Sequence, residues 1–355
     1  MKKHNFSAGP CILPQQVFKE ASSSILNFNN LDLSLIEISH RSADFVAVME
    51  EAVQLVKELL EVPSGYSVLF LQGGASIEFL MVANNLMKDG GKAGYLDTGV
   101  WSSKAIKEAK LFGDTQILAS SKDKNYSYIP KDYAIPYDLD YFHCTSNNTI
   151  FGTQIKAFPI TDVVTVCDMS SDIFSKKIDV SKFDLIYSGA QKNLGPAGTT
   201  LVIVKDEILG HTGREIPTML DYKTHIAKDS MFNTPPVFPI YVSMLTMRWL
   251  KDNGGVSWIE KLNQQKAELL YQTIDNSSIF EGSANIEDRS TMNATFLLTN
   301  TELEEEFNNM CINGGINGLK GHRSVGGYRA SMYNAMPQES VQALVEIMNE
   351  LERKG

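Results

Sequence analysis

A lysine and an aspartate, each placed just after a short apolar segment, are the side chains whose chemistry the sequence suggests first. Lys192 follows the apolar segment 183–187 and the small-residue turn 188–191, and Asp168 directly follows the apolar segment 163–167. Both segments are predicted to be strands. A lysine amine can form a Schiff base with an aldehyde, and a carboxylate can keep a pyridine nitrogen protonated. The pair therefore fits pyridoxal phosphate, although a surface lysine and a strand-end aspartate of any α/β protein would give the same pattern.

A glycine turn earlier in the chain could bind the phosphate of such a cofactor. The apolar segment 67–71 is followed by the turn 73–76 (Gly-Gly-Ala-Ser), and a helix is expected over 77–87. At such a turn, unbonded backbone N–H groups and the positive end of the helix dipole face an anion, and glycines allow its close approach. An ordinary strand-to-helix turn would look the same. No G-x-G-x-x-G or G-x-x-x-x-G-K-[ST] motif supports a dinucleotide or nucleoside-triphosphate site.

The elements that must position these groups alternate between strands and helices. Strands are predicted at 67–71, 93–96, 140–145, 163–167, 183–187 and 199–204, and helices at 15–27, 43–60, 77–87, 102–111 and 239–251. This alternation predicts an α/β fold with a mostly parallel sheet covered by helices on both faces. Ligands of such sheets bind at the carboxyl ends of the strands. Ser76, Trp101, Asp168 and Lys192 all lie at or just past predicted strand ends, which favours one shared site.

A smaller α+β domain is expected after a helix-ending Asn-Gly-Gly signal at 253–255. It contains a long helix over 256–274, a strand at 292–298, a helix at 302–313, a glycine-rich segment at 314–327 and a final helix from 337. We therefore divide the chain into a large cofactor-binding domain, residues 16–255, and a small domain made of residues 1–15 and 256–355.

Composition narrows the classes of function. The chain has 355 residues, of which 43% are hydrophobic, enough for one large and one smaller core. The net charge is −10 and no basic tract is present, so nucleic acid is not an expected partner. No segment approaches 18 apolar residues and no apolar region follows the basic N-terminus, so neither a membrane span nor a signal peptide is predicted. The four cysteines show no C-x-x-C spacing, which favours a cytoplasmic protein over a disulfide or metal site.

Six segments, in this order, resemble the phosphoserine aminotransferase family, which belongs to class V of the fold-type I pyridoxal-phosphate enzymes. They are 6–10 (Phe-Ser-Ala-Gly-Pro), 37–42 (Glu-Ile-Ser-His-Arg-Ser), 71–76 (Leu-Gln-Gly-Gly-Ala-Ser), 188–193 (Ser-Gly-Ala-Gln-Lys-Asn), 233–236 (Asn-Thr-Pro-Pro) and 321–327 (Gly-His-Arg-Ser-Val-Gly-Gly). The resemblance covers essentially the whole chain and implies the aspartate-aminotransferase-like fold.

The resemblance also implies a reaction. It is reversible amino transfer between O-phospho-L-serine and 2-oxoglutarate, giving 3-phosphohydroxypyruvate and L-glutamate in L-serine biosynthesis. The 4-phosphohydroxy-L-threonine step of pyridoxine biosynthesis is a further candidate. The alternatives are another class V aminotransferase or lyase with a different small substrate, and a non-catalytic phosphometabolite-binding protein. Lys192 argues against the last, because binding alone does not need an imine-forming amine.

By resemblance, Lys192 is the catalytic residue, which holds the cofactor and moves a proton at the substrate. The residues expected to bind the cofactor are Ala75, Ser76, Trp101, Thr149, Asp168, Gln191, Lys192, Asn233 and Thr234. Trp101 would stack on the cofactor ring, although a core tryptophan is the alternative, and Thr149 would bond the 3′-oxygen. The residues expected to bind the substrate are His40, Arg41, His322 and Arg323 around the phosphate and Arg329 at the α-carboxylate. Surface salt bridges are the alternative for each arginine.

A homodimer with shared active sites is implied as well. The Asn233-Thr234 pair lies in the stretch 210–237, which is predicted to be irregular and which a compact monomer has little reason to keep. In the family this pair completes the phosphate cup of the neighbouring subunit, and the His40-Arg41 pair also reaches the partner's site. Two positions depart from the pattern. Some members have an arginine in the glycine turn, here Ala75-Ser76, so part of the anion binding is expected to be weaker here or to be supplied by Arg323. Some have a serine at the position of Ala8, a contact that cannot be a side-chain hydroxyl here.

Overall fold

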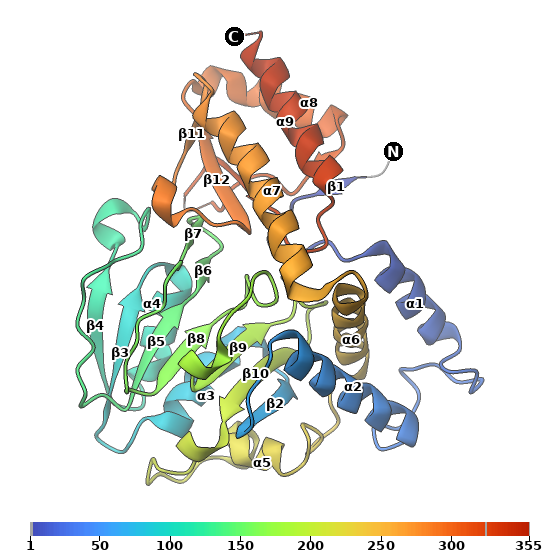
Figure 1. The fold of residues 1–355 in the computed structure, drawn as a ribbon, viewed down its shortest axis with the longest axis vertical. Coiled ribbons are helices and arrows are strands. Elements are labelled where there is room, and N and C mark those ends of the chain that lie inside the picture. Colours follow the sequence, from blue (N-terminus) through green and yellow to red (C-terminus); the bar gives the residue numbers. More distant parts are fainter. Residues whose placement is uncertain (1–2, 324, 355) are drawn as a thin grey trace.

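The computed structural model describes residues 3–323 and 325–354, and its centre is a seven-stranded sheet (Figure 1). The strands in spatial order are β2 (Tyr66–Leu71), β10 (Thr200–Lys205), β9 (Leu185–Gly189), β8 (Thr165–Asp168), β5 (Tyr141–Thr145), β3 (Lys92–Asp97) and β4 (Asp114–Ser120). β10 runs antiparallel to both of its neighbours, and the other adjacent pairs are parallel. The predicted α/β fold with a mostly parallel sheet is confirmed. Ser324, part of the segment 321–327, lies outside the described residues.

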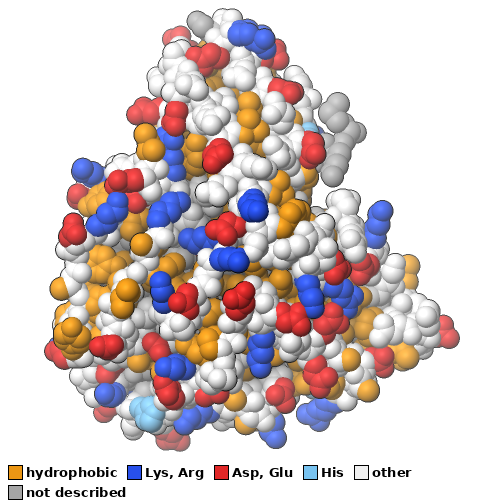
Figure 2. Space-filling view, in the orientation of Figure 1, with side chains coloured by type: hydrophobic (Ala, Val, Ile, Leu, Met, Phe, Trp, Pro, Cys, Tyr) orange, Lys and Arg blue, Asp and Glu red, His pale blue; other side chains and the backbone are white. Residues whose placement is uncertain are grey.

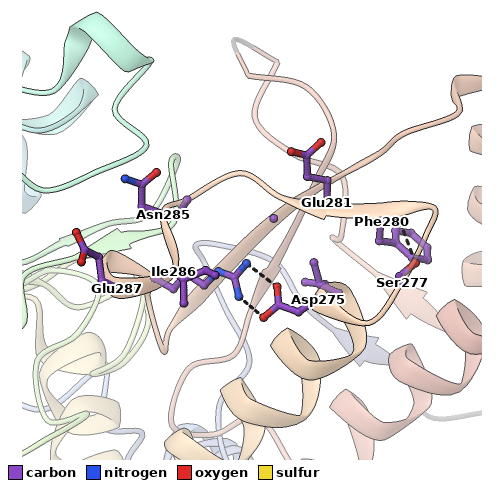
Figure 3. Close-up of a pocket in the computed structure, with 11 residues that line it drawn as sticks. Asp275, Ser277, Phe280, Glu281, Asn285, Ile286 and Glu287 are labelled. Atoms are coloured by element: carbon purple, nitrogen blue, oxygen red, sulfur yellow. Dashed lines mark hydrogen bonds and ion pairs between the residues drawn. The ribbon is translucent and has the colours of Figure 1, made fainter.

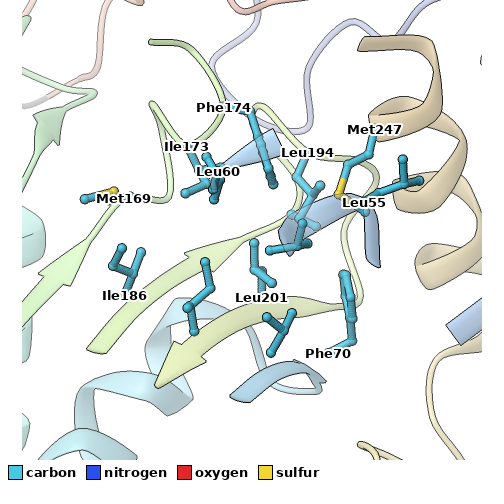
Figure 4. Packing of buried hydrophobic residues seen from close by; sticks show 14 of the residues in the cluster. Leu55, Leu60, Phe70, Met169, Ile173, Phe174, Ile186, Leu194, Leu201 and Met247 are labelled. Carbon is cyan, nitrogen blue, oxygen red and sulfur yellow. The ribbon is translucent and has the colours of Figure 1, made fainter. Parts of the chain in front are cut away.

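Helices cover both faces of this sheet because its strand residues alternate between two apolar clusters. In β2, Phe70 belongs to one cluster and Leu69 and Leu71 to the other. The first cluster contains α2 (Ala43–Leu59) and α6 (Val237–Asp252), with α1 (Gln15–Leu26) packed on α6. The second contains α3 (Gly74–Leu86), α4 (Val100–Ala109) and α5 (Tyr222–Ile226). Figure 4 shows part of the first cluster, to which Ile186 and Leu201 of the sheet belong together with Leu55 of α2 and Met247 of α6.

Local sequence explains where these helices begin. Ser42 precedes α2, and its hydroxyl accepts a hydrogen bond from the Phe45 N–H at 3.5 Å. Gly73 precedes α3 with a φ of 97°, and an added Cβ there would lie 2.4 Å from the Ile77 side chain. α3 therefore starts at Gly74, three residues earlier than predicted, and the predicted turn residues Ala75 and Ser76 belong to its first turn.

A second, smaller unit surrounds an antiparallel sheet (Figure 1). Its strands are β11 (Phe280–Gly282), β12 (Asn293–Leu298) and β14 (Tyr328–Ser331), and its helices are α7 (Gly255–Asp275), α8 (Glu304–Asn313) and α9 (Gln338–Glu352). Its apolar core joins Phe6 with residues from 267 to 351. The N-terminus reaches it through β1 (His4–Asn5), which pairs with β13 (Ile316–Asn317). The exact domain division given above stays a prediction.

Several parts of the chain differ from what the sequence predicted, among them the short strands β1, β11, β13 and β14, which were not predicted. Strand β4 was not predicted, and the stretch 210–237 is not wholly irregular, because it contains α5. Asp221 caps α5 by accepting the Lys223 N–H at 2.9 Å. A two-stranded hairpin, β6 (Asn147–Asn148) and β7 (Thr153–Gln154), was also missed. The remaining short elements are 3₁₀ helices at Lys122–Lys124, Val180–Lys182, Asp206–Ile208, Thr218–Leu220, Ile286–Asp288 and Thr301–Leu303.

The surface charge and the hydropathy of the helices can be described for the folded chain. On the described part of the face in Figure 2, lysine and arginine side chains are interspersed with aspartate and glutamate, without one continuous basic patch. Within residues 3–323 and 325–354, no helix combines the length and the apolar character needed to cross a membrane.

Candidate active site

Lys192 lies just past the end of β9, in the turn that leads to β10, and its side chain is buried. Its Nζ donates a hydrogen bond to Thr149 Oγ1 at 2.7 Å and lies 5.0 Å from the centroid of the Trp101 ring. Its backbone carbonyl accepts a hydrogen bond from the Cys11 thiol. Burial lowers the pKa of the Lys192 amine to about 8, against the opposing effect of the Asp168 carboxylate and with a further lowering by Arg329. Near neutral pH a substantial fraction of this amine is therefore neutral and nucleophilic.

Asp168 ends β8, the strand beside β9, and is 4% exposed. Its Oδ1 accepts the Ser170 N–H at 2.9 Å, and no salt bridge to it exists among the residues that the structure describes. Burial raises the pKa of this carboxyl group, while the hydrogen bond from Ser170 and the charge of Lys192 lower it. A buried carboxylate without an ionic partner is unusual. It is suited to face a cationic group of a bound ligand.

Trp101 lies in the first turn of α4, because this helix begins at Val100, two residues before the predicted start at 102. Gly99, two residues before Trp101, allows the backbone to pass close to the Asn148 side chain, because an added Cβ would lie 2.9 Å from Asn148 Oδ1. The indole Nε1 is buried and has no hydrogen-bond partner among the described residues. Its ring is half-buried beside the Lys192 amine, so a flat ligand could stack there and supply a partner for the indole N–H.

The glycine turn also lies close to the Lys192 turn, because Leu71 pairs with Thr200 and Thr200 pairs with Gly189. Ala75 and Ser76 occupy the first turn of α3, whose N-terminus has no side-chain cap. Its first N–H groups are therefore available to an anion. Gln191 precedes Lys192, and its side-chain amide lies against Gly189, where an added Cβ would be 2.7 Å from Oε1.

Arg329 approaches from the smaller unit, on β14. Its Nη1 donates a long hydrogen bond of 3.4 Å to the carbonyl of Thr149, the residue that also contacts Lys192. Its Nε is buried without a hydrogen-bond partner, and no carboxylate pairs with the guanidinium in the described part of the chain. Burial lowers the pKa of Arg329. An unpaired, partly buried guanidinium beside the reactive lysine is suited to bind a carboxylate.

His322 lies close enough to Arg329 and Arg323 to be affected by their charges. Burial lowers the pKa of His322, and the positive charges of Arg329, Arg323 and Lys104 lower it further. Arg323 is exposed. Lys104 was not among the predicted residues, yet its Nζ lies 4.6 Å from the Trp101 ring centroid. The signal that could have identified it is its spacing of three residues from Trp101 on a helix.

The remaining predicted residues lie at the edge of this arrangement or apart from it. Asn233 and Thr234 are exposed, and Gln72 Nε2 donates to Asn233 Oδ1 at 3.4 Å and to the Thr234 carbonyl at 3.0 Å. His40 is half-buried and its Nε2 has no partner, while Arg41 is exposed. Within one chain, no hydrogen bond or ion pair among described residues joins the His40-Arg41 pair to Lys192, Thr149 or Arg329.

A large open pocket elsewhere does not have this chemistry. Its volume is about 760 Å³, and it lies between the end of α7, β11 and residues 284–289 (Figure 3). Arg289 there is paired with Asp275, with Nη2 and Oδ1 2.7 Å apart, so its charge is already compensated. The groups that could react with a ligand or bind its negative charge lie around Lys192 instead.

The residues around Lys192 fit pyridoxal phosphate. The amine, the unpaired buried carboxylate, the unbonded indole N–H and the uncapped start of α3 match the aldehyde, the ring nitrogen, the ring face and the phosphate. A metal centre has no comparable support, since the described residues contain no cluster of three or more His, Cys, Asp or Glu able to hold an ion. The individual residue roles stay predictions.

Comparisons with known proteins agree with this chemistry. The model of the family "Aminotransferase class-V" matches residues 3–344. Curated phosphoserine aminotransferases of Flavobacterium psychrophilum and Flavobacterium johnsoniae are 68% and 65% identical, over 100% of both chains in each case.

Solved structures give the same result. Phosphoserine aminotransferase from Bacillus circulans subsp. alkalophilus has a TM-score of 0.97 and 45% identity, with 99% of each chain covered. The pyridoxal-phosphate-bound phosphoserine aminotransferase of Trichomonas vaginalis has a TM-score of 0.93 and 33% identity, covering 98% of this chain and 100% of that one. The chain therefore belongs to the class V aminotransferases, in the family of the phosphoserine aminotransferases.

Proposed function

We propose that this chain is a pyridoxal-phosphate-dependent enzyme that transfers an amino group between O-phospho-L-serine and 2-oxoglutarate, a step of L-serine biosynthesis. The observation that carries the proposal is the buried Lys192 amine, held against Thr149 and Trp101 and close to Arg329, whose guanidinium has no acidic partner among the described residues. The names of the relatives, at up to 68% identity over the full chain, support the substrate. The same cations would suit 4-phosphohydroxy-L-threonine, which also carries a phosphate and an α-amino acid group.

The residues around Lys192 have separable roles in this proposal. Bound pyridoxal phosphate supplies an electron sink for the charge that develops at the substrate Cα. The Lys192 amine has a pKa of about 8, so it can accept the Cα proton and return a proton on the cofactor side. The Asp168 carboxylate holds positive charge at the ring nitrogen, and Trp101 covers the ring face. Because these groups are buried or half-buried, water is largely excluded from the proton transfer.

Substrate recognition divides between two anions. Arg329 is placed to bind the α-carboxylate, which every amino-acid substrate shares, because its guanidinium extends to Thr149 beside Lys192. His322 and Arg323 would bind the phosphate, which glutamate, serine and alanine lack. A planar guanidinium binds such anions with two parallel hydrogen bonds.

We also propose a homodimer in which each site is completed by a second copy. Asn233, Thr234 and Arg41 are exposed, and five of the apolar side chains in the segment before Arg41 are exposed as well. These apolar residues are Ile25, Leu26, Leu31, Leu33 and Ile36, with Leu26 83% and Ile36 63% exposed. Such a run on one segment is typical of an interface. It would carry the His40-Arg41 pair to the phosphate site of the second copy. Mass measurement in solution tests this, and a fully active monomer would contradict it.

Two further proposals concern organisation and location. The separate apolar core of Phe6 and residues 267–351 supports a small domain of residues 1–15 and 256–355 beside a large domain of residues 16–255. Four unpaired cysteines support a reducing, cytoplasmic environment.

The reaction is tested by steady-state assays with 2-oxoglutarate as the acceptor. Phosphoserine, serine and alanine are compared as donors, and glutamate formation is measured. The proposal expects a kcat/KM for phosphoserine that far exceeds the values for serine and alanine. Equal values would contradict it and would favour another class V aminotransferase with a substrate that has no phosphate.

A further inference from the structure

Lys104 is a cation at the active site that the predicted substrate-binding set does not include. It lies three residues after Trp101 on α4, a spacing that places both side chains on one face of the helix. Its Nζ is 4.6 Å from the Trp101 ring centroid, and the Lys192 Nζ is 5.0 Å from the same point. The two ammonium groups are therefore separated by no more than the sum of these distances.

The charge of Lys104 is not compensated by an acidic side chain. No salt bridge involves it anywhere in residues 3–323 and 325–354, and the same holds for Arg323 and Arg329. All three cations act on His322, whose pKa they lower together with burial. Like charges gathered in this way repel one another in the absence of a ligand. A dianion placed among them would remove that repulsion and would interact with each cation.

The position of Lys104 also bears on the glycine turn. The first turn of α3, which contains Ala75 and Ser76, has no cationic side chain of its own. Lys104 comes from the neighbouring helix, since α3 and α4 pack together. A cation–π contact with Trp101 alone would account for the distance but not for the shared influence on His322.

We propose that Lys104 is a specificity-determining residue whose ammonium group binds the phosphate of the amino-acid substrate, together with His322 and Arg323. This inference rests on the proposed function. The long, flexible lysine side chain carries a point charge that can move from the indole face to a phosphate oxygen when substrate enters. The phosphate carries a charge of roughly −1.5 to −2 at neutral pH, so it gains more from an added cation than a carboxylate does.

The experiment compares Lys104→Met, Lys104→Arg and the control Lys107→Met in the holoenzyme. Lys107 is exposed on the same helix, three residues after Lys104. Lys107→Met changes the net charge by the same amount as Lys104→Met. For Lys104→Met we expect kcat/KM for phosphoserine to fall about tenfold, the effect of one charge-assisted hydrogen bond at an exposed site, mainly through KM. We expect a smaller fall in kcat/KM for glutamate. Lys104→Arg should restore the kcat/KM for phosphoserine, and Lys107→Met should give the same values as the unchanged chain.

A binding measurement without turnover gives an independent readout. Calorimetric titration with inorganic phosphate should give a Kd about tenfold weaker for Lys104→Met than for the unchanged chain or Lys107→Met. Equal Kd values, or equal losses of kcat/KM for phosphoserine and glutamate, would overturn the role of Lys104 in phosphate binding. Lys104 would then have only its contact with the Trp101 ring. If the unchanged chain failed to turn over phosphoserine at all, the proposed function would fall, and the phosphate titration would still decide the role of Lys104.

Discussion

Arg329 and Arg323 should have different effects on substrate choice, because they are proposed to bind different anions. Replacing Arg329 by alanine removes a guanidinium whose hydrogen bond to the Thr149 carbonyl is long, 3.4 Å, so the cost to folding is small. What the variant loses is the proposed interaction with the α-carboxylate of the substrate. A charge-assisted hydrogen bond contributes about 1.5–3 kcal/mol, which corresponds to roughly a 10- to 150-fold loss in kcat/KM.

The pattern across substrates tests this assignment. For Arg329→Ala we expect similar losses with phosphoserine, glutamate and alanine, because all three carry an α-carboxylate. For Arg323→Ala we expect a loss of about tenfold or more with phosphoserine and little change with alanine. The assay is the initial rate at limiting donor concentration, with the folded state of each variant checked by thermal unfolding. Equal losses for both variants on every donor would refute the division of the site into a carboxylate half and a phosphate half.

Arg329 also affects the lysine, which provides a second readout. Its positive charge lowers the pKa of Lys192, so the pKa of this amine should rise in Arg329→Ala. The neutral amine is the form that reacts with the cofactor aldehyde. The rate at which apoprotein recombines with pyridoxal phosphate should therefore reach its plateau at higher pH in Arg329→Ala. An unchanged pH profile would show that the charge of Arg329 does not reach Lys192.

Three further predictions concern the large domain. Asp168→Asn should lower kcat by roughly 10²–10³-fold, the range for removing one preorganised electrostatic group, and an unchanged kcat would show that another group faces the ring nitrogen. Gly73→Ala should reduce the free energy of unfolding by about 1–3 kcal/mol in urea titrations, because φ is 97° and the new Cβ would lie 2.4 Å from Ile77; equal unfolding midpoints would contradict the strained turn. Glu78 is buried with its Oε2 bonded to the Tyr222 hydroxyl at 2.6 Å, and burial raises its pKa from 4.5 to about 7. Between these two values the folded state binds more protons than the unfolded state, so stability should fall as pH rises from 4.5 to about 7. Glu78→Gln should flatten that slope, and an identical slope in the variant would exclude Glu78 as its source.

Local patterns predicted most of the large unit of the fold because they report burial directly. Apolar runs predicted that Asp168 and Lys192 lie at or just past the ends of two strands. In the structure these strands are β8 and β9, which are neighbours in the sheet. The direction of a strand has no such local signal. The antiparallel course of β10 depends on its two neighbours in the sheet, so the sequence did not predict it. Strand β4 lies at the sheet edge and is half exposed, which weakens its apolar pattern.

In the candidate site, too, local features were predicted and features that depend on tertiary structure were not. The glycine turn was recognised, but the helix start could not be predicted, since it depends on the left-handed conformation of Gly73. Lys104 was missed because an exposed lysine on a helix is common, and only its distance to Trp101 sets it apart. The stretch 210–237 was predicted to be irregular because α5 is only five residues long and depends on the tertiary contact between Tyr222 and Glu78. In the proposed homodimer, the place of the His40-Arg41 pair depends on a second copy of the chain, which one sequence cannot position.

The central claim is that Lys192 holds the cofactor, and chemical trapping tests it most directly. Purified holoenzyme is treated with borohydride, digested and analysed by mass spectrometry, with Lys192→Ala treated in parallel. The account predicts that the visible absorbance disappears on reduction and that the cofactor is found attached to the peptide containing Lys192, with no adduct in Lys192→Ala. An adduct on any other lysine, or absorbance and full turnover retained in Lys192→Ala, would contradict it.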